Sequence, residues 1–484
     1  MSMKNLLARG PRDDLHDSTT HGRRELLRRV LFAGGAAALG GAGLGTLARL
    51  AQGQDEEPAE DRFYVFAYFN GGWDTLLGID PRDPGVFTDD NVGVTRIQPG
   101  YGFQSAAEFR EPPALVPGTS ILLGPAARPL DAVGDRLAVV RGMSMDTLTH
   151  EVGRRRFLTG KPPSGLLARG SAGSAWLASR FGGDRLIPNL TVRVESFNPE
   201  LATEVSALRV SSSSDLVALL RRADPVMDPE IEDAIDALHH DEASCPRSLS
   251  SPILRASDSS HRRMRAVLEA DVQALFDFSV DPTSIADPAL RAKMEQLHAH
   301  FALRGSGRRP AHEQAAIAGQ ALAHGVARVV TIQANPTSLD THFDDWEDAQ
   351  GPRQRDAFEA IARLVEYLGS VEYGGGESML DRTTIVGFSE FMRTPLLNAR
   401  GGRDHWLTNS AFLIGGNIRR GAVIGASSDA GMSPQAVDLE TGAVDPGGEV
   451  IRPEHIWRTL LADAGLADDQ ADLRAPIIPA LLAT

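Results

Sequence analysis

Four short apolar runs constrain the fold of this chain more than any other feature of its sequence. They lie at residues 63–69, 137–140, 327–332 and 383–388 and carry almost no charge. Runs this short, without alternation of apolar and polar residues, are typical of strands buried on both faces of a parallel sheet. Each run ends just before a polar cluster, so reactive residues are expected at the strand ends.

Helical patterns separate the apolar runs. Apolar residues recur at three- and four-residue spacing over residues 263–277, 312–324 and 356–368, which predicts helices. Strands that alternate with helices indicate a doubly wound, mostly parallel α/β sheet flanked by helices, and such a sheet binds ligands at the carboxyl ends of its strands. Residues 80–118 and 205–262 are expected to be loops or insertions that could form a cap or lid.

Residues 1–55 are predicted to be an export signal and linker. Arg23 and Arg24 precede an uncharged segment at residues 30–47 that is rich in Ala, Gly and Leu. This pattern resembles a Tat signal, which implies the Tat export machinery as a partner and a periplasmic or extracellular location. Anchoring through an uncleaved signal is the main alternative. Residues 56–484 are then expected to form one α/β domain, with an insertion at about 205–262.

Charge and cysteine content exclude several classes of function. The chain has 49 Lys and Arg against 64 Asp and Glu, a net charge of −15, and no long basic run after residue 30. The electrostatic footprint of a nucleic-acid-binding protein is therefore missing. Cys245 is the single cysteine, so neither an intramolecular disulfide nor a thiolate metal site can form. Any metal is expected on His, Asp and Glu.

Carboxylates and imidazoles gather at the ends of the predicted strands. Oxygen and nitrogen ligands without sulfur suit zinc, manganese or iron, and leave such a metal a Lewis acid that can activate water or an ester oxygen. The residues of these clusters are Asp74, His150, Asp340, His342, Glu390, Asp404 and His405.

Taken singly, these residues also have structural explanations. Asp74 suits a turn or a helix N-cap, Glu390 could pair with a nearby arginine, and a lone histidine in a loop, such as His150, is more often structural. The histidine pairs at 239–240 and 298–300 lie away from the predicted strand ends. We expect both pairs to be solvated.

The C-terminal clusters resemble the signature of a known family. Residues 389–395 read Ser-Glu-Phe-Met-Arg-Thr-Pro, residues 402–406 read Gly-Arg-Asp-His-Trp, and Gly-Gly-x-Ile follows at 415–418. This order is similar to that of the domain-of-unknown-function 1501 family. The resemblance covers roughly residues 60–480 and is weakest in the middle third. Met392 departs from it, because members usually have Gly there.

Earlier landmarks of the same family are also present. Gly-Gly-x-Asp ends at Asp74, and Asp-Thr-His supplies Asp340 and His342, preceded by Ser338 and Leu339 where members usually have Gly-Trp. A Tat-like leader is frequent in the family.

The family is similar to the alkaline phosphatase and sulfatase superfamily, and this likeness implies roles for the clustered residues. It implies an alkaline-phosphatase-like fold that holds one or two divalent ions. Phe391 stands where the superfamily has a ligand histidine. Asp404 is either a further ligand or the acceptor that orients an imidazole. The implied metal ligands are Asp74, Asp340, His342, Glu390, Asp404 and His405.

The likeness breaks down at the nucleophile. Arg154 and residues 158–160 match the Arg and Leu-Thr-Gly of sulfatases, which puts His150 where those enzymes have Cys or Ser. His150 is thus implied to be a metal ligand, a general base or a covalent nucleophile. Arg154 or Arg393 would stabilise charge on the oxygens of the ester.

The implied function is that of an exported, metal-dependent hydrolase of phosphate or sulfate esters, acting on a small-molecule or polymer substrate. The alternative is a metal-binding module of the same fold at the cell envelope, without catalysis. The departures at Phe391 and His150 favour this alternative.

Overall fold

The computed structural model describes residues 61–483, apart from 184, 306–308, 467–468 and most of 222–271. The predicted Tat-type signal and linker at residues 1–55 lie outside the described residues. So does most of the predicted insertion at about 205–262 and of the helix predicted at 263–277. Among the helices that are described, none is both long and apolar enough to cross a membrane.

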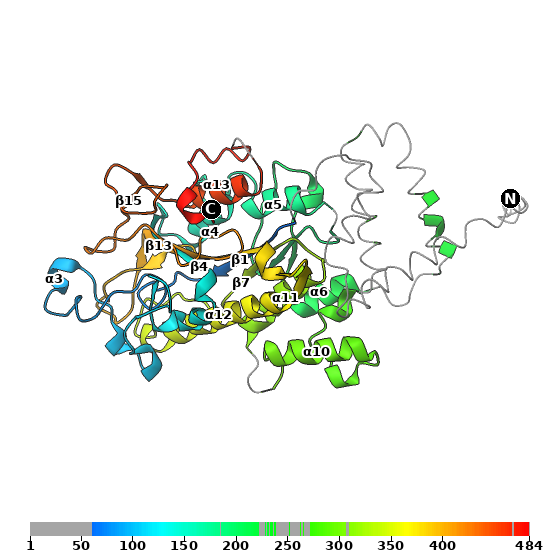
Figure 1. The fold of residues 1–484 in the computed structure, drawn as a ribbon, viewed down its shortest axis with the longest axis horizontal. Coiled ribbons are helices and arrows are strands. Elements are labelled where there is room, and N and C mark those ends of the chain that lie inside the picture. Colours follow the sequence, from blue (N-terminus) through cyan, green and yellow to red (C-terminus); the bar gives the residue numbers. More distant parts are fainter. Residues whose placement is uncertain are drawn as a thin grey trace, which may run out of the picture.

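A central eight-stranded sheet organises the described chain (Figure 1). Seven strands run in the same direction and β13 runs against them, so the prediction of a mostly parallel sheet is confirmed. All four apolar runs became strands of this sheet. In spatial order the strands are β14 (Val423–Ile424), β4 (Leu137–Ser144), β13 (Thr408–Gly415), β10 (Thr383–Ser389), β1 (Phe63–Phe69), β7 (Val329–Gln333), β5 (Asn189–Val192) and β6 (Leu208–Val210).

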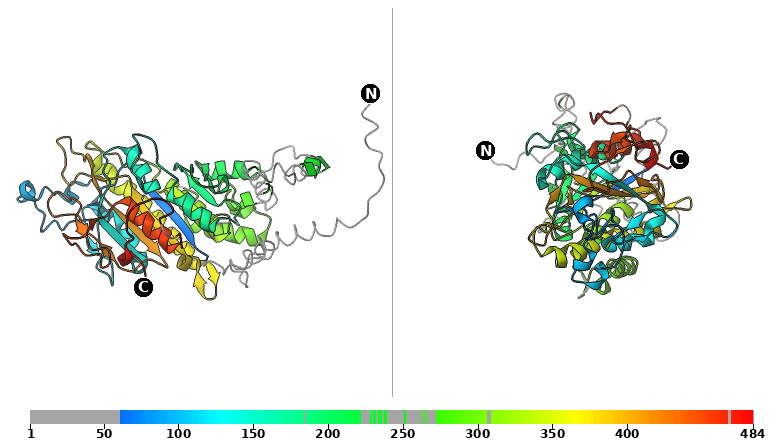
Figure 2. Two further views of the ribbon diagram at one scale, coloured as in Figure 1. Left: turned by 90° about the horizontal axis from the view of Figure 1, so that it is seen from above. Right: turned by 90° about the vertical axis from the view of Figure 1, so that its left-hand side faces the viewer.

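Helices cover both faces of the sheet, as Figure 1 shows. The end-on view in Figure 2 places the orange-red α13 above the strands. The predicted helices at 312–324 and 356–368 are confirmed: the second lies within α12, and the first coincides with α11 except for its last residue, His324. One face carries α11 (Pro310–Ala323), α12 (Trp346–Ser370) and the 3-10 helix η4 (Pro125–Arg136); the other carries α4 (His150–Thr159), α5 (Gly173–Phe181) and α13 (Pro453–Asp463).

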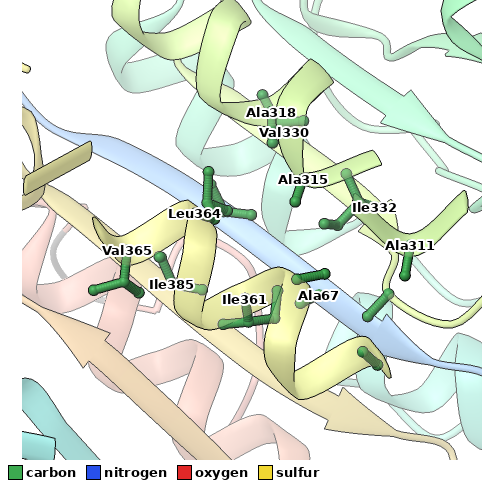
Figure 3. Close-up of a cluster of buried hydrophobic side chains, with 14 of the residues drawn as sticks. Ala67, Ala311, Ala315, Ala318, Val330, Ile332, Ile361, Leu364, Val365 and Ile385 are labelled. Atoms are coloured by element: carbon green, nitrogen blue, oxygen red, sulfur yellow. The ribbon is translucent and has the colours of Figure 1, made fainter. Parts of the chain in front are cut away.

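Alternation along β1 divides the core into two layers. All seven residues of β1 are buried, and successive side chains of a strand point to opposite faces. Val65, Ala67 and Phe69 join the core under α11 and α12, part of which is drawn in Figure 3. The other side chains of the strand, including Phe66, pack towards α4 and α13. Burial on both faces explains why the run lacks polar residues.

The remaining elements lie around this layered centre. Residues 80–118 are largely loop, as predicted. The short helices are α3 (Val92–Thr95), α6 (Ser213–Leu220), α10 (Pro288–His300), η2 (Tyr101–Phe103), η3 (Ala107–Phe109), η5 (Thr203–Val205), η6 (Val272–Leu275), η7 (Pro282–Ser284), η8 (Met379–Arg382) and η9 (Pro479–Leu481). The two-stranded sheets pair β2 (Ala114–Leu115) with β3 (Leu122–Leu123), β8 (Glu372–Gly374) with β9 (Glu377–Ser378), β11 (Met392–Arg393) with β12 (His405–Trp406), and β15 (Ala436–Val437) with β16 (Glu449–Val450).

The expectation that the pair at 298–300 is solvated is wrong for His298. This residue is 7% exposed and lies on the same side of α10 as the buried Met294 and Leu297. Its position on the packed side of an amphipathic helix explains the burial. The pair at 239–240 lies outside the described residues.

Two glycines bring the loops at the end of the sheet together. Gly71, just after β1, has φ +106°, and a Cβ there would lie 2.3–2.7 Å from Ser338 Oγ and from the backbone nitrogens of Leu339 and Asp340. Gly153, on α4, leaves room for the backbone of Glu390: a Cβ would lie 2.5 Å from that carbonyl oxygen. Only glycine permits both approaches, so the glycines determine how closely the strand-end loops pack.

Replacing Gly153 with Ala is expected to destabilise the fold by about 1–3 kcal/mol, because the added methyl group must push α4 away from Glu390. Alanine in an exposed helix would instead stabilise by roughly 0.5–1 kcal/mol. Urea denaturation measures the difference. Gly93→Ala on α3 is the control, since nothing lies within 4 Å of its added Cβ. Equal stability of the two variants would show that α4 does not pack this tightly.

Candidate metal centre

Four side chains meet at the carboxyl ends of β1, β7 and β10. They are His150, the first residue of α4, Asp340 and His342 in the loop after β7, and His405 on β12. Asp340 Oδ1 lies 3.1 Å from His342 Nε2, 3.4 Å from His150 Nε2 and 3.6 Å from His405 Nε2. The ligand atoms of His150, Asp340 and His405 all lie within 4.8 Å of one another. We call these four residues the metal centre.

The three imidazoles of the metal centre share one orientation. Each Nδ1 faces an oxygen acceptor behind the ring, so Nδ1 carries a proton and Nε2 faces Asp340. Histidines that bind metals in proteins are nearly always held in this way. The acceptors are Glu390 Oε1 for His150 at 2.6 Å, Asp404 Oδ1 for His342 at 2.7 Å and the carbonyl oxygen of Leu148 for His405 at 2.6 Å.

The donor set suits a divalent cation. His342 Nε2 and His405 Nε2 lie 2.9 Å apart, and two lone pairs so close need a proton or a cation near them. His150 Nε2 is buried and makes no hydrogen bond within the described part of the chain. Nitrogen ligands of a tetrahedral zinc ion are roughly 3.3 Å apart, close to the distance between His342 Nε2 and His405 Nε2. His150, Asp340, His342 and His405 therefore fit a cation.

Two carboxylates enclose His150 and change its pKa. Burial disfavours the imidazolium, but hydrogen bonds and charges from Asp340 and Glu390 outweigh burial and raise the pKa of His150 to about 9. The hydrogen bonds from His150 and His405, together with Arg393, hold the pKa of Asp340 well below its usual range. Without a cation, a protonated His150 therefore bridges the two carboxylates.

Glu390 is oriented away from the metal centre. Its side chain is fully buried, and Oε1 accepts hydrogen bonds from the backbone nitrogen of Gly71 at 2.9 Å and from His150. Ser389 Oγ donates to Oε2 at 2.8 Å. Both oxygens thus have partners within the protein. The structure gives Glu390 the position of an acceptor that orients His150, and not that of a ligand.

Arg393 ties the surrounding loops together. Its side chain is fully buried, and each of its five N–H donors has an acceptor. No donor remains for the oxygens of an ester, so Arg393 is a positioning residue. The acceptors are the carbonyl oxygens of Gly71, Gly72 and Arg403, His342 Nε2 at 3.3 Å and Asp340 Oδ1 at 2.5 Å.

Arg154 lies away from the metal centre. Its Nε donates to Glu195 Oε1 at 3.0 Å, and its guanidinium carbon lies 6.0 Å from the centre of the Tyr68 ring. The Tyr68 hydroxyl interacts with both Arg154 and Glu390. Arg154 is therefore connected to the partner of His150 through Tyr68, and its own ion pair is with Glu195.

Asp74 is likewise not brought to the metal centre. Its fully buried side chain accepts a hydrogen bond from Trp346 Nε1 at 2.9 Å, and its Oδ2 lies 2.9 Å from Arg403 Nε. The backbone nitrogen of Leu76 donates to Oδ1 at 3.0 Å. Asp74 is the counterion of the buried Arg403, and this ion pair anchors the loop that leads to His405.

Sequence reasoning missed two parts of the centre. The carbonyl oxygen of Leu148 orients His405, and a backbone atom leaves no signal in the sequence. Phe391 is fully buried, with its ring centre 4.8 Å from that of His150 and 4.3 Å from that of His405. It forms an apolar wall against both imidazoles. In the sequence, Phe391 is recognisable only as a residue that replaces a ligand histidine of the superfamily.

Comparisons with known proteins found one family. The model described as "Protein of unknown function (DUF1501)" matches residues 101–441. No curated protein matches the chain.

Solved structures similar to the chain include "Ps i-CgsB in complex with k-i-k-neocarrahexaose", with 8% identity, a TM-score of 0.37 and coverage of 86% of this chain and 75% of the other. The "PsFucS1 sulfatase from Pseudoalteromonas sp." has 11% identity, a TM-score of 0.33 and coverage of 95% and 77%.

Replacing Asp74 with Asn distinguishes a buried counterion from a ligand. The variant is expected to lose about 3 kcal/mol of stability or more, because Arg403 keeps a buried charge without its partner. Folded Asp74→Asn protein should still bind zinc as the parent does, whereas Asp340→Asn should not. Denaturation and metal analysis of the refolded fractions measure both effects. Loss of zinc from folded Asp74→Asn protein would make Asp74 a ligand after all.

Zinc binding to the metal-free protein is expected to release a proton from His150 at pH 7, since the pKa of His150 is about 9 and its Nε2 must lose a proton to coordinate. Affinity should therefore rise with pH and level off as the pH passes 9. Calorimetry in two buffers of different ionisation enthalpy measures the release. His150→Asn is the control and should release about one proton fewer than the parent. A binding enthalpy that does not depend on the buffer would contradict this assignment.

Proposed function

Because this chain belongs to the DUF1501 family, whose description names no activity, we propose its function from the site: a metal-dependent hydrolase of phosphate or sulfate esters. The observation that carries the proposal is the convergence of three imidazole Nε2 atoms on Asp340 Oδ1. Each imidazole is oriented by an acceptor behind it, which is the arrangement of a preorganised ligand set.

Each residue around the centre has a distinct role in this proposal. His150, Asp340, His342 and His405 would hold the cation. When bound, the cation supplies a Lewis acid that polarises an ester oxygen and lowers the pKa of water. Glu390, Asp404 and the carbonyl of Leu148 keep the imidazoles in the Nδ1-protonated tautomer. Arg393 fixes Asp340, and Phe391 excludes water from one side of the rings.

The centre is accessible to a substrate. The side chain of Asp340 is 40% exposed, and those of His342, His150 and His405 are 27%, 25% and 20% exposed. The group therefore opens to solvent on the side of Asp340, opposite the buried Arg393. An ester can approach from that side without the protein rearranging. A Tat-type leader, which the sequence predicts, would place this reaction in the periplasm or outside the cell.

A metal-binding module without catalysis is the second candidate. It is favoured by the engagement of both predicted catalytic arginines, Arg154 with Glu195 and Arg393 with the loops of the site. These partners draw Nε of Arg154 and the donors of Arg393 away from the charge that develops on an ester. In this case the cation would stabilise the strand-end loops, and turnover would be absent.

The test combines metal analysis with turnover. Protein purified without added metal, and then loaded with zinc, manganese or iron, is assayed on 4-nitrophenyl phosphate and sulfate. We expect bound metal in the parent, and neither metal nor turnover in His405→Ala. His300→Ala on α10, whose Nε2 bonds to the carbonyl oxygen of Arg363, is the control and should behave as the parent.

Bound metal with no hydrolysis of either ester class would favour the binding module. Protein that binds no divalent metal, or that turns over equally well with His405→Ala, would overturn both candidates.

A further inference from the structure

An exposed aromatic ring lies beside the metal centre and carries an arginine on one face. Phe343, the residue after His342, is 53% exposed, and the guanidinium carbon of Arg400 lies 4.4 Å from the centre of its ring. The uncovered part of the ring is apolar surface that a bound ligand could remove from water. A ring held in this way next to a reactive centre therefore calls for an explanation.

Backbone contacts fix the position of this pair. Phe343 forms an antiparallel bridge with Gly401, and a Cβ on Gly402 would lie 2.2–2.5 Å from backbone atoms of His342 and Phe343. The loop that carries Arg400 therefore lies directly against the loop that carries His342. The pair of Phe343 and Arg400 is held by two touching loops and does not depend on side-chain contacts alone.

A single carboxylate separates Arg400 from the metal centre. Arg400 Nη2 lies 3.7 Å from Asp404 Oδ1, and this same oxygen lies 2.7 Å from His342 Nδ1. Asp404 thus lies between the guanidinium of Arg400 and the imidazole of His342. The other nitrogen of that imidazole, Nε2, is one of the proposed ligand atoms. Arg400 and Phe343 are therefore connected to the ligand set through Asp404 and through the backbone of His342.

Arg400 differs from the other arginines of the site because its donors are unused. Its side chain is 55% exposed and, within the described residues, makes the ion pair at 3.7 Å and the ring contact but no hydrogen bond. Arg393 and Arg403, by contrast, are fully buried and donate to backbone carbonyls. A guanidinium with free N–H donors matches the two oxygens of a carboxylate or similar anion.

Two further apolar side chains are exposed next to the ligand residues. Leu148, whose carbonyl orients His405, is 46% exposed, and Leu407, two residues after His405, is 47% exposed. Leu148, Phe343 and Leu407 are thus three exposed apolar side chains carried by the segments that hold the ligand residues. Small alkyl esters or polyhydroxylated alcohols would gain little from contact with these side chains, whereas a ring would bury part of their surface.

We propose that Phe343 and Arg400 bind the alcohol part of the ester, and that this part is a ring bearing a second anionic group such as a carboxylate. This inference rests on the proposed ester hydrolysis, because it names the class of substrate for the same centre. The ring packs on Phe343, while the guanidinium of Arg400 binds the second anion. The two residues select the substrate and take no part in the chemical step.

The test compares three esters on the metal-loaded protein: methyl, phenyl and 4-carboxyphenyl phosphate, together with the corresponding sulfates. We expect kcat/KM to rise in that order. Phe343→Leu should reduce the preference for phenyl over methyl about three- to tenfold. Arg400→Met should reduce the preference for 4-carboxyphenyl over phenyl about three- to tenfold, with the phenyl-to-methyl ratio unchanged.

A second arginine and phenylalanine pair supplies matched controls. The guanidinium carbon of Arg180 lies 5.8 Å from the centre of the Phe181 ring at the end of α5. Phe181 packs on Tyr64, at the start of β1, with ring centres 5.9 Å apart, so this pair lies at the opposite edge of the sheet. Arg180→Met and Phe181→Leu should leave both preferences unchanged. Metal content, measured for all four variants, should equal that of the parent.

Binding of phosphonates separates this inference from the proposed hydrolysis. Methyl-, phenyl- and 4-carboxyphenylphosphonate cannot be hydrolysed at the phosphorus–carbon bond, and calorimetry measures their affinity for the zinc-loaded protein. If no ester is hydrolysed but these affinities follow the expected order and depend on Arg400, the ring-and-anion site stands while the hydrolase fails. If esters are hydrolysed and Arg400→Met keeps the parent's preferences, as Arg180→Met does, the site proposed here is wrong.

Discussion

The buried guanidinium of Arg393 is the interaction on which the arrangement of the metal centre depends. Parallel strands bring their carboxyl ends to one edge of the sheet, but this fixes positions only to within several residues. Arg393 donates to the loop after β1, to Asp340 and His342 after β7, and to the carbonyl oxygen before β12. Burying a charge is costly unless every donor is satisfied. Any shift of one loop would break a bond to this charge, so the three loops hold one relative position.

A second buried arginine, Arg403, fixes neighbouring loops in the same way as Arg393. Arg403 pairs with Asp74 and donates to the carbonyl oxygens of Gln98, Pro99 and Thr394. It connects the turn after β1 with residues close to His405. Arg393 and Arg403 are both fully buried and donate to fixed acceptors of the protein, so neither is exposed to a substrate. Arg393 and Arg403, which lie within the sequence motif, and Asp74 therefore have a structural role: they fix the loops that carry the proposed ligands.

The sequence predicted the strands and the edge at which the centre lies, but not the direction of every side chain. The apolar runs predicted β1, β4, β7 and β10, and the rule of carboxyl ends predicted that Asp340, His342 and His405 would lie near one another. Asp74 could not be placed, because two glycines with positive φ, 106° and 73°, turn the chain between β1 and Asp74. Arg154 lies one helical turn after His150 and still pairs with Glu195, a residue distant in sequence. Such long-range pairings leave no local pattern.

The polar groups that hold the interior of the site have hydrogen-bond partners within the protein, whereas the side chain of Arg400 at its rim has none among the described residues, and this difference separates two roles. In the interior, Glu390, Asp404 and the carbonyl of Leu148 each accept from an imidazole, so the ligand nitrogens are oriented before any cation or substrate arrives. Preorganisation of this kind suits a reaction shared by many esters, since it recognises no particular alcohol. At the rim, Phe343 is exposed and Arg400 has free donors within the described part of the chain. In the function proposed here, differences in binding free energy between substrates are expected to arise at this rim, because specificity requires groups whose interactions change when the substrate changes.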